Sequence, residues 1–223
     1  DASRVYGLEL EHILSPNNIN FLIYKDTLIE EHVLGVPGDQ FLEENLKNVS
    51  VRGLKRLSKE FVKFNERCMI RLLGDMRAYN YVIVASYDFD QVQYRIRAMD
   101  FDQQSFEGNL KVYFPQFFKE NYPFVKMVAD NLQEESVEQY RKEERSAIAR
   151  RLRGSQKRIH RLIDCMRKDH ISTPEKIDQL KMDLKNYTLD KNFKGCNSMG
   201  DILSVAFDFV VRNYENVNTY IIR

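Results

Sequence analysis

A chain of 223 residues is long enough to bury one large core or two small ones, and its 43% hydrophobic and 30% charged residues exclude a disordered or collagen-like segment. The formal net charge of +1 excludes a general attraction to nucleic acid or anionic membranes, so any such attraction must be local. Three widely spaced cysteines and the lack of an apolar run of roughly 20 residues predict a reducing compartment without a membrane span, and favour the cytoplasm.

The first part of the chain predicts a helix, a hairpin and a connection. Apolar side chains recur at helical spacing within residues 1–14, and a following proline is expected to end that helix. Two short apolar runs, residues 19–24 and 27–33, are separated by a polar dipeptide and predict a β-hairpin. We interpret residues 35–42 as a connection rather than a third strand, because Pro37 has no N–H to donate to a strand ladder.

The centre of the chain predicts a long helix followed by a second hairpin. The helix is expected to end near Gly74. Its buried stripe consists of apolar residues three or four positions apart: Leu57, Phe61, Phe64, Cys68 and Leu72. After the helix, residues 81–86 and 92–99 are β-rich and flank a polar turn, so they are expected to pair. The rest is expected to be helical, including a charged span at residues 133–168 and an apolar closing helix at residues 202–211.

Three polar residues stand where these central elements meet. Asp75 follows the long helix, Asn80 precedes the first strand of the second hairpin, and Asp100 follows the second strand in the string AMDFD. Because a hairpin brings its two ends together, the three side chains are expected to share one cleft. Phosphoryl transfer needs a carboxylate near the attacking hydroxyl and further oxygens that hold magnesium against the phosphates. The order G-D-x4-N, hairpin, D-F-D therefore indicates a phosphoryl-transfer site.

This arrangement resembles the protein-kinase-like superfamily, closest in style to its atypical aminoglycoside-phosphotransferase, HipA-like and lipid-kinase branches, whose catalytic loops carry GD where protein kinases often have RD. The resemblance implies an α+β catalytic lobe, mostly helical with short β-hairpins, with ATP and magnesium as cofactors. It implies that Asp75 is the catalytic base and that Asn80 and Asp100 are metal ligands. Asp102 stands where glycine is usual and is expected to add a further carboxylate to the metal site.

The resemblance extends to the start of the chain and runs to about residue 125. Residues 1–34 resemble a remnant of the N-lobe, with the C-helix, the fourth and fifth strands and the hinge, and residues 35–223 resemble the helical C-lobe. The backbone of four hinge-like residues is implied to hydrogen-bond adenine: Glu31, His32, Val33 and Leu34. The glycine-rich phosphate loop and the lysine-bearing strand of the family have no counterpart before the first helix, so most of an N-lobe is missing from these residues.

The sequence leaves three functions open, of which the first is transfer of the terminal phosphate of ATP to a hydroxyl of an unidentified small molecule or protein. The second is a pseudokinase-type module that binds an acidic or phosphate-rich partner through a basic helical surface. Five cations would form that surface: Arg150, Arg151, Arg153, Lys157 and Arg158. A solvated amphipathic helix remains the favoured interpretation of the same span.

The third function is a metal-dependent nuclease with clustered carboxylates. Its four candidate ligands are Asp75, Asp88, Asp100 and Asp102. The near-zero net charge and the kinase-like order of elements count against this function. Asp88 is expected in the turn of the hairpin, where aspartate is favoured for its hydrogen bonds to the backbone, and therefore away from the cleft.

An aromatic-rich stretch, residues 112–124, follows Asp100 where kinases have the activation segment. We interpret Phe117, Phe118 and Phe124 as core residues rather than as contacts to a phosphate acceptor, because large aromatic side chains are more often buried.

Overall fold

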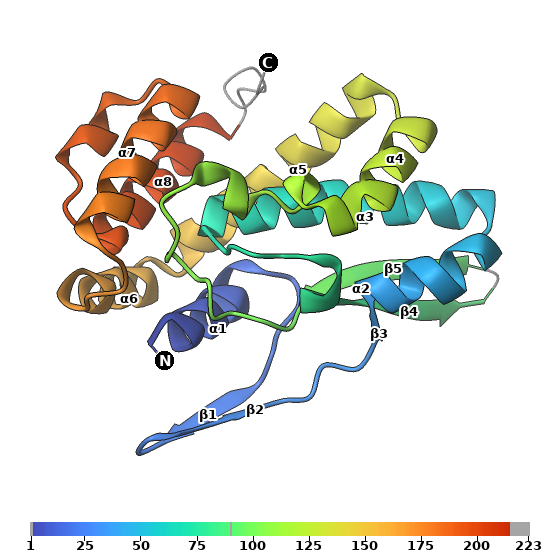
Figure 1. Ribbon diagram of the computed structural model, residues 1–223, viewed down its shortest axis with the longest axis horizontal. Coiled ribbons are helices and arrows are strands. Elements are labelled where there is room, and N and C mark those ends of the chain that lie inside the picture. The colour runs from blue at the N-terminus through green and yellow to red at the C-terminus, as the bar shows by residue number, and fades with distance from the viewer. Residues whose placement is uncertain (1, 90, 215–223) are drawn as a thin grey trace.

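Helices form most of the molecule, and two small antiparallel sheets lie along one side of it (Figure 1). The computed structural model describes residues 2–89 and 91–214. The α+β class expected from the sequence is confirmed. Within the described residues, no helix is both long and apolar enough to cross a membrane.

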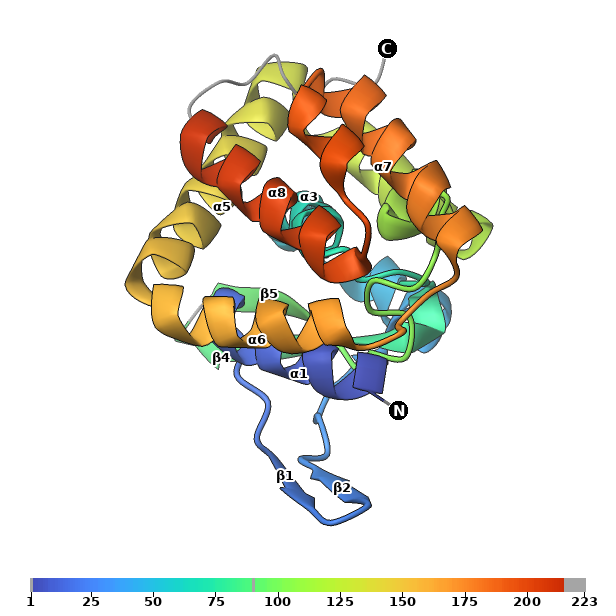
Figure 2. The ribbon, with the colours of Figure 1, turned by 90° about the vertical axis from the view of Figure 1, so that its left-hand side faces the viewer.

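The chain begins with the predicted helix and hairpin. Helix α1 spans Ala2–Leu14, and strands β1 (Phe21–Tyr24) and β2 (Thr27–Glu30) pair with each other as a two-stranded sheet. This hairpin projects from the helical body in both views (Figures 1 and 2). Most of its side chains are exposed, so its contact with the body is made through its base.

The interpretation of residues 35–42 as a connection without a strand was wrong. Strand β3 (Val36–Pro37) pairs with β4 (Tyr81–Asp88), with Pro37 opposite Val82. The strand order β3-β4-β5 places β3 at the edge of its sheet. An edge strand has only one neighbour, so the missing N–H of a proline is tolerated there. Immediately after it, helix α2 spans Gly38–Gln40.

The central elements confirm the predicted helix and hairpin. Helix α3 spans Val51–Arg71. The Ser50 hydroxyl caps its start by accepting from Gly53 N at 3.1 Å, and Leu72, in the left-handed conformation, caps its end. Strand β5 (Gln91–Ala98) pairs with β4 along its whole length. The predicted stripe of α3 is buried throughout.

The second half of the chain is helical, as expected. Its helices are α4 (Tyr122–Asn131), α5 (Glu134–Gly154), α6 (Gln156–Lys168), α7 (Pro174–Thr188) and α8 (Met199–Asn213). Helix α8 packs against α5 and α6, which Figure 2 shows beside it. A π-turn lies at Phe41–Asn45, and 3-10 turns lie at Leu46–Asn48, Ala78–Asn80, Leu110–Tyr113, Pro115–Phe117, Lys119–Asn121 and Lys191–Gly195.

Two hydrophobic clusters stabilise this arrangement, and α1 contributes to both. Leu10 and Ile13 pack with the helices of the second half of the chain. Leu8 instead belongs to a cluster with side chains of α3 from Leu57 to Cys68, with residues of β4 and β5, and with Val33. The first helix and the hinge-like residue Val33 therefore pack into the same hydrophobic clusters as the rest of the chain.

Charged side chains are also buried between α1, α3 and α5. Glu11 of α1 pairs with Arg71 of α3, and Arg67 of α3 pairs with Glu144 of α5 at 3.3 Å. Arg145 of α5 donates in turn to a buried glutamate of α3 at 2.5 Å. Because buried charges are stable only when paired, these contacts determine how the three helices sit against one another.

Candidate functional site

The loop after α3 is a compact turn that carries Asp75 and Asn80. Asp75 has a left-handed backbone conformation, with φ of 55°, which turns the chain back toward the sheet. The side-chain nitrogen of Asn80 donates to the carbonyl of Asp75 at 2.7 Å, and its backbone N–H donates to the carbonyl of Arg77 at 2.8 Å. Both ends of the G-D-x4-N string are thus fastened to each other.

The segment that carries Asp100 is hydrogen-bonded directly to this loop. Met99 N donates to the carbonyl of Asn80 at 3.0 Å, one position beyond the last pair of the β4–β5 ladder. Gly74 N donates to the carbonyl of Gln103 at 3.2 Å. The two segments that bear Asp75, Asn80 and Asp100 therefore lie side by side at the open end of the hairpin, as the order of elements predicts.

Arg77 contacts the candidate base. Its Nε donates to Asp75 Oδ1 at 2.7 Å, and its Nη1 donates to Glu120 Oε1 at 3.0 Å. The hydrogen bond to Asp75 raises the pKa of Arg77 above its ordinary value, so the guanidinium remains charged. The guanidinium carbon of Arg77 also lies 4.8 Å from the centre of the Phe118 ring, which places this aromatic side chain beside the loop.

Arg4 of α1 contacts the other two candidate carboxylates. Its Nη1 donates to Asp102 Oδ1 at 3.0 Å and lies 3.4 Å from Asp100 Oδ1. Its Nε and Nη2 both donate to Glu30, the latter at 2.8 Å. The hydrogen bond to Glu30 is the main cause that raises the pKa of Arg4. The sequence does not predict Arg4 and Glu30 at this site, because no local pattern links them to residues so distant in the chain.

A cavity of about 290 Å³ lies between the hinge-like segment and the two residues that flank Asp100. Its wall includes three of the four predicted adenine-contacting residues together with residues on either side of Asp100: Arg4, Ile19, Glu30, Glu31, His32, Val33, Met99 and Phe101. The fourth, Leu34, is 74% exposed and lines a separate groove beside β4.

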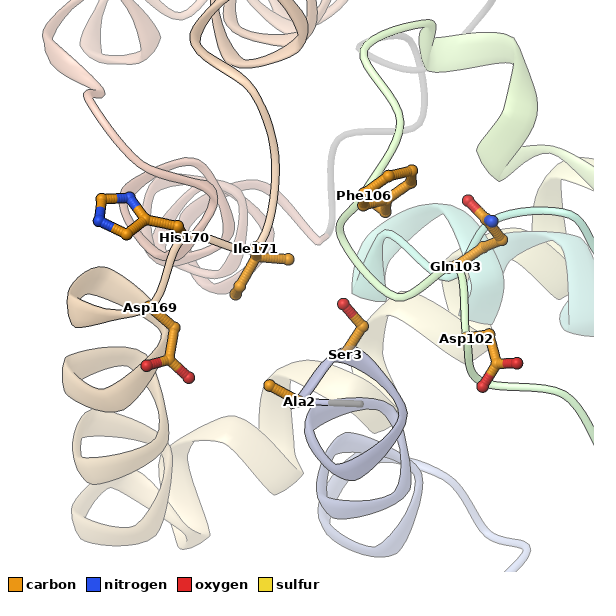
Figure 3. A pocket seen from close by; sticks show the side chains of 8 residues that line it. All are labelled: Ala2, Ser3, Asp102, Gln103, Phe106, Asp169, His170 and Ile171. Atoms are coloured by element: carbon orange, nitrogen blue, oxygen red, sulfur yellow. The ribbon is translucent and has the colours of Figure 1, made fainter.

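A second cavity, of about 440 Å³, is lined by Asp102 (Figure 3). Three segments form its wall: the start of α1, the residues after Asp102, and the junction of α6 and α7. The lining residues are Ala2, Ser3, Asp102, Gln103, Phe106, Asp169, His170 and Ile171. Ser172 fastens the junction to the segment after Asp102 by donating to the carbonyl of Phe106 at 2.5 Å.

The predicted metal ligands fit magnesium in donor type. The nitrogen of the Asn80 amide is engaged with Asp75, so its oxygen is the atom left for a ligand. Asp100 and Asp102 add carboxylate oxygens, which hard divalent cations prefer. Over residues 2–89 and 91–214, no group of three or more His, Cys, Asp or Glu side chains is arranged to hold a metal ion. Arg4 instead occupies one oxygen of each aspartate.

Asp88 lies at the far end of the β4–β5 hairpin, where it pairs with Gln91 beside the turn. The carboxylate cluster of the nuclease hypothesis therefore lacks this member.

Of the aromatic residues in the segment after Asp100, Phe124 is fully buried, as expected, whereas Phe117 is 45% exposed. Phe118 is only partly buried, so the expectation of a core position is met by Phe124 alone.

The five predicted surface cations differ in their contacts. Arg151 donates to the carbonyl of Leu14 at 2.9 Å, which fastens α5 to α1. Arg153 donates to the carbonyl of Val211 at 3.1 Å, and Arg158 forms an ion pair with a glutamate of α1. Arg150 and Lys157 are exposed. Three of the five therefore contact other parts of the chain, which supports the interpretation of this span as amphipathic helices.

No family model, curated protein or solved structure matches the chain. The kinase-like resemblance therefore rests on the residues described above and on their arrangement.

Proposed function

We propose that the chain is the catalytic lobe of an ATP- and magnesium-dependent phosphotransferase with a protein-kinase-like fold, which acts on a hydroxyl of a small molecule or protein. One observation carries the proposal. The hinge-like residues Glu31 to Val33 and the residues beside Asp100 line one cavity, and the loop that bears Asp75 and Asn80 is hydrogen-bonded to the same segment. Nucleotide, metal and acceptor hydroxyl must meet at such a junction.

Each group of residues has its own part in the proposed chemistry. The backbone around Glu31 to Val33 would bind the adenine edge, and the oxygens of Asn80, Asp100 and Asp102 would hold magnesium. Bound magnesium supplies charge neutralisation on the phosphates. Asp75 accepts the proton of the attacking hydroxyl through the oxygen that does not face Arg77, and Arg77 holds the carboxylate in position.

A second candidate is a binding module of the same fold. It is favoured by the arginine contacts of the three carboxylates, because Asp75 pairs with Arg77 while Asp100 and Asp102 pair with Arg4. Such pairs stabilise a carboxylate that performs no chemistry. In this case Arg150 and Lys157, the exposed members of the basic span without the contacts described above, would bind the partner.

The test is Asp100→Asn in the native full-length protein, with Asp88→Asn as a matched control at the distal turn. Magnesium-dependent ATP consumption should fall about 100-fold or more in Asp100→Asn and stay unchanged in the control, because only Asp100 lies at the site. The free energy of unfolding, measured by thermal denaturation, should change by less than about 1 kcal/mol in either variant. Asparagine keeps the shape of aspartate and one acceptor oxygen.

Equal ATP consumption by Asp100→Asn and the unsubstituted protein would refute the assignment of Asp100. If the unsubstituted protein neither binds nor consumes ATP, the binding module is the correct function.

A further inference from the structure

Strand β4 has a free outer edge over its second half. It pairs with β5 along its whole length, but with β3 only at Val82 and Ile83. Beyond Ile83, no strand of the described chain lies beside that edge. Natural sheets usually protect such an edge with charged side chains or proline, because its unpaired N–H and C=O groups can bind another strand. From Val84 to Tyr87, β4 carries neither protection.

The hydrogen-bond pattern identifies the backbone groups that are free. Met99 N donates to the carbonyl of Asn80 at 3.0 Å, and antiparallel strands alternate between residue pairs that exchange hydrogen bonds and pairs that do not. Every second residue of β4, counted from Asn80, therefore bonds to β5. Ala85 and Tyr87 fall between these residues, so their N–H and C=O groups point to the outer edge. Among the described residues, no other strand or turn bonds to them.

A groove of about 450 Å³ lies beside this edge. Ala85 and Tyr87 line it together with the amide side chain of Asn48 and the aromatic rings of Phe41 and Tyr94. The centres of these two rings lie 6.1 Å apart. The described residues that line the groove are all uncharged. A charged group placed in it would lose its hydration without gaining a partner of opposite charge.

The edge and the groove together define what can bind there. A residue opposite Ala85 on an added antiparallel strand would exchange two hydrogen bonds with it. Its side chain would point to the same face of the sheet as Ala85 and its cross-strand partner Tyr94, and therefore into the groove. The residue opposite Tyr87 would do the same. The residue between them would point to the opposite face, where the side chain of Ser86 is exposed.

We propose that the outer edge of β4, from Val84 to Tyr87, is a docking site for an extended segment of a partner protein that carries apolar side chains at alternate positions. The segment adds a strand to the sheet in line with β3. Hydrogen bonds to the backbone of Ala85 and Tyr87 supply the affinity, and the uncharged groove selects the side chains. This docking site goes beyond the proposed phosphotransferase and does not depend on it, because none of its proposed catalytic or metal-binding residues lines the groove.

The probe is a fluorescent, end-capped peptide of alternating residues, Thr-Val-Thr-Val-Thr, titrated into the folded chain and followed by fluorescence polarisation. The same peptide with N-methyl groups on both valines cannot donate to β4, and should bind about tenfold more weakly or worse. Replacing both valines by serine should weaken binding by about tenfold as well, because the groove then holds no apolar side chain.

Two substitutions at one position test the edge itself. Ala85→Pro removes the outward N–H and leaves the hydrogen bonds between β4 and β5 in place, so binding should weaken by about tenfold or more. Ala85→Ser is the matched control, because it keeps the N–H, and it should change the affinity by less than about twofold. Asp100→Asn should bind the peptide as the unsubstituted chain does, which separates this site from the proposed phosphotransfer.

Amide hydrogen exchange measured by NMR locates the bound peptide. In the free chain, the amides of Val84 and Ser86 should exchange slowly because they bond to β5, and those of Ala85 and Tyr87 should exchange fast. Adding the peptide should slow exchange at Ala85 and Tyr87 by about tenfold or more. Peptide binding that leaves these two amides fast would overturn the proposal, since the peptide would then lie elsewhere.

The proposal also fails if the N-methylated peptide binds as tightly as the unmodified one, or if the unmodified peptide does not bind at about 1 mM. If the amides of Ala85 and Tyr87 are already slow in a free chain that sediments as a dimer, the edge pairs with a second copy and the proposed partner protein is wrong. If circular dichroism shows that Ala85→Pro is unfolded, the comparison of the two peptides decides alone.

Discussion

Replacing Glu11 by leucine should destabilise the protein severely, because Glu11 is the buried partner of Arg71 between α1 and α3. The side chains of Glu11 and Arg71 are only 3% and 2% exposed. Without Glu11, the guanidinium keeps its hydrogen bond to the carbonyl of Arg67 at 3.1 Å but loses its compensating charge. Removing one partner of a buried ion pair costs about 3–5 kcal/mol.

This loss is large compared with the total stability of about 5–15 kcal/mol of an ordinary domain. For a chain of this length it corresponds to a fall in melting temperature of about 6–20 °C. Removing both charges, in Glu11→Leu with Arg71→Met, should restore most of the stability, since apolar side chains of similar volume replace buried ion pairs at little cost. The two substitutions should therefore be coupled by about 2 kcal/mol or more.

Urea unfolding followed by circular dichroism, with all four proteins of the cycle, measures this coupling. Glu9→Leu is the matched control on the same helix, because Glu9 pairs with Arg158 at the surface and should lose no more than about 1 kcal/mol. A loss below about 1 kcal/mol for Glu11→Leu would refute the reasoning. So would a double variant whose loss equals the sum of the two single losses.

Two further predictions concern side chains of contrasting burial. Phe124→Ala should lower the free energy of unfolding in urea by about 3–5 kcal/mol, because the ring is fully buried and its centre lies 5.2 Å from that of the stacked Phe61 ring. An equal loss for Phe117→Ala, whose ring is 45% exposed, would contradict this. The exposed Cys165 should react at once with an aromatic disulfide reagent at pH 8. Burial raises the pKa of Cys68 to about 12 and that of Cys196 to about 11, so these two thiols should react only after unfolding. A fast reaction that persists in Cys165→Ser would show this assignment to be wrong.

Local patterns predict most of the elements that position the site. The apolar residues within residues 1–14 and along α3 recur at helical spacing. Such spacing marks the one face of a surface helix that packs against the core. The runs around the polar turn at Asp88 predict the β4–β5 hairpin, whose geometry alone brings Asn80 next to the segment of Asp100. The adjacency of the segments that bear the three polar residues is therefore a consequence of short-range sequence.

The error at Pro37 shows where local reasoning ends. Proline excludes a central strand position but not an edge position, and the difference depends on which strands lie on either side. Pairing of β3 with β4 joins residues more than forty positions apart, and no pattern within residues 35–42 contains that information. Strand order is a property of the assembled sheet.

The sequence also does not predict that the charged face of α3 is buried. The buried apolar stripe is visible in the spacing of Leu57 to Leu72, but Glu66, Arg67 and Arg71 are buried as well. Such side chains enter a core only when opposite charges from other helices meet them, as those of α1 and α5 do. Their burial is decided by packing rather than by the periodicity of α3.

By itself, the sequence determined the long helices, the two hairpins and the adjacency of the backbone segments that bear Asp75, Asn80 and Asp100, because each depends on spacing or on a single turn. Only the tertiary structure decided the charge at the site. Arg4 is 26 residues from Glu30, 96 from Asp100 and 98 from Asp102, and folding alone brings these groups together. Electrostatic interactions act through distance in space, so the counter-ion of a carboxylate cannot be identified before the fold that supplies it is known.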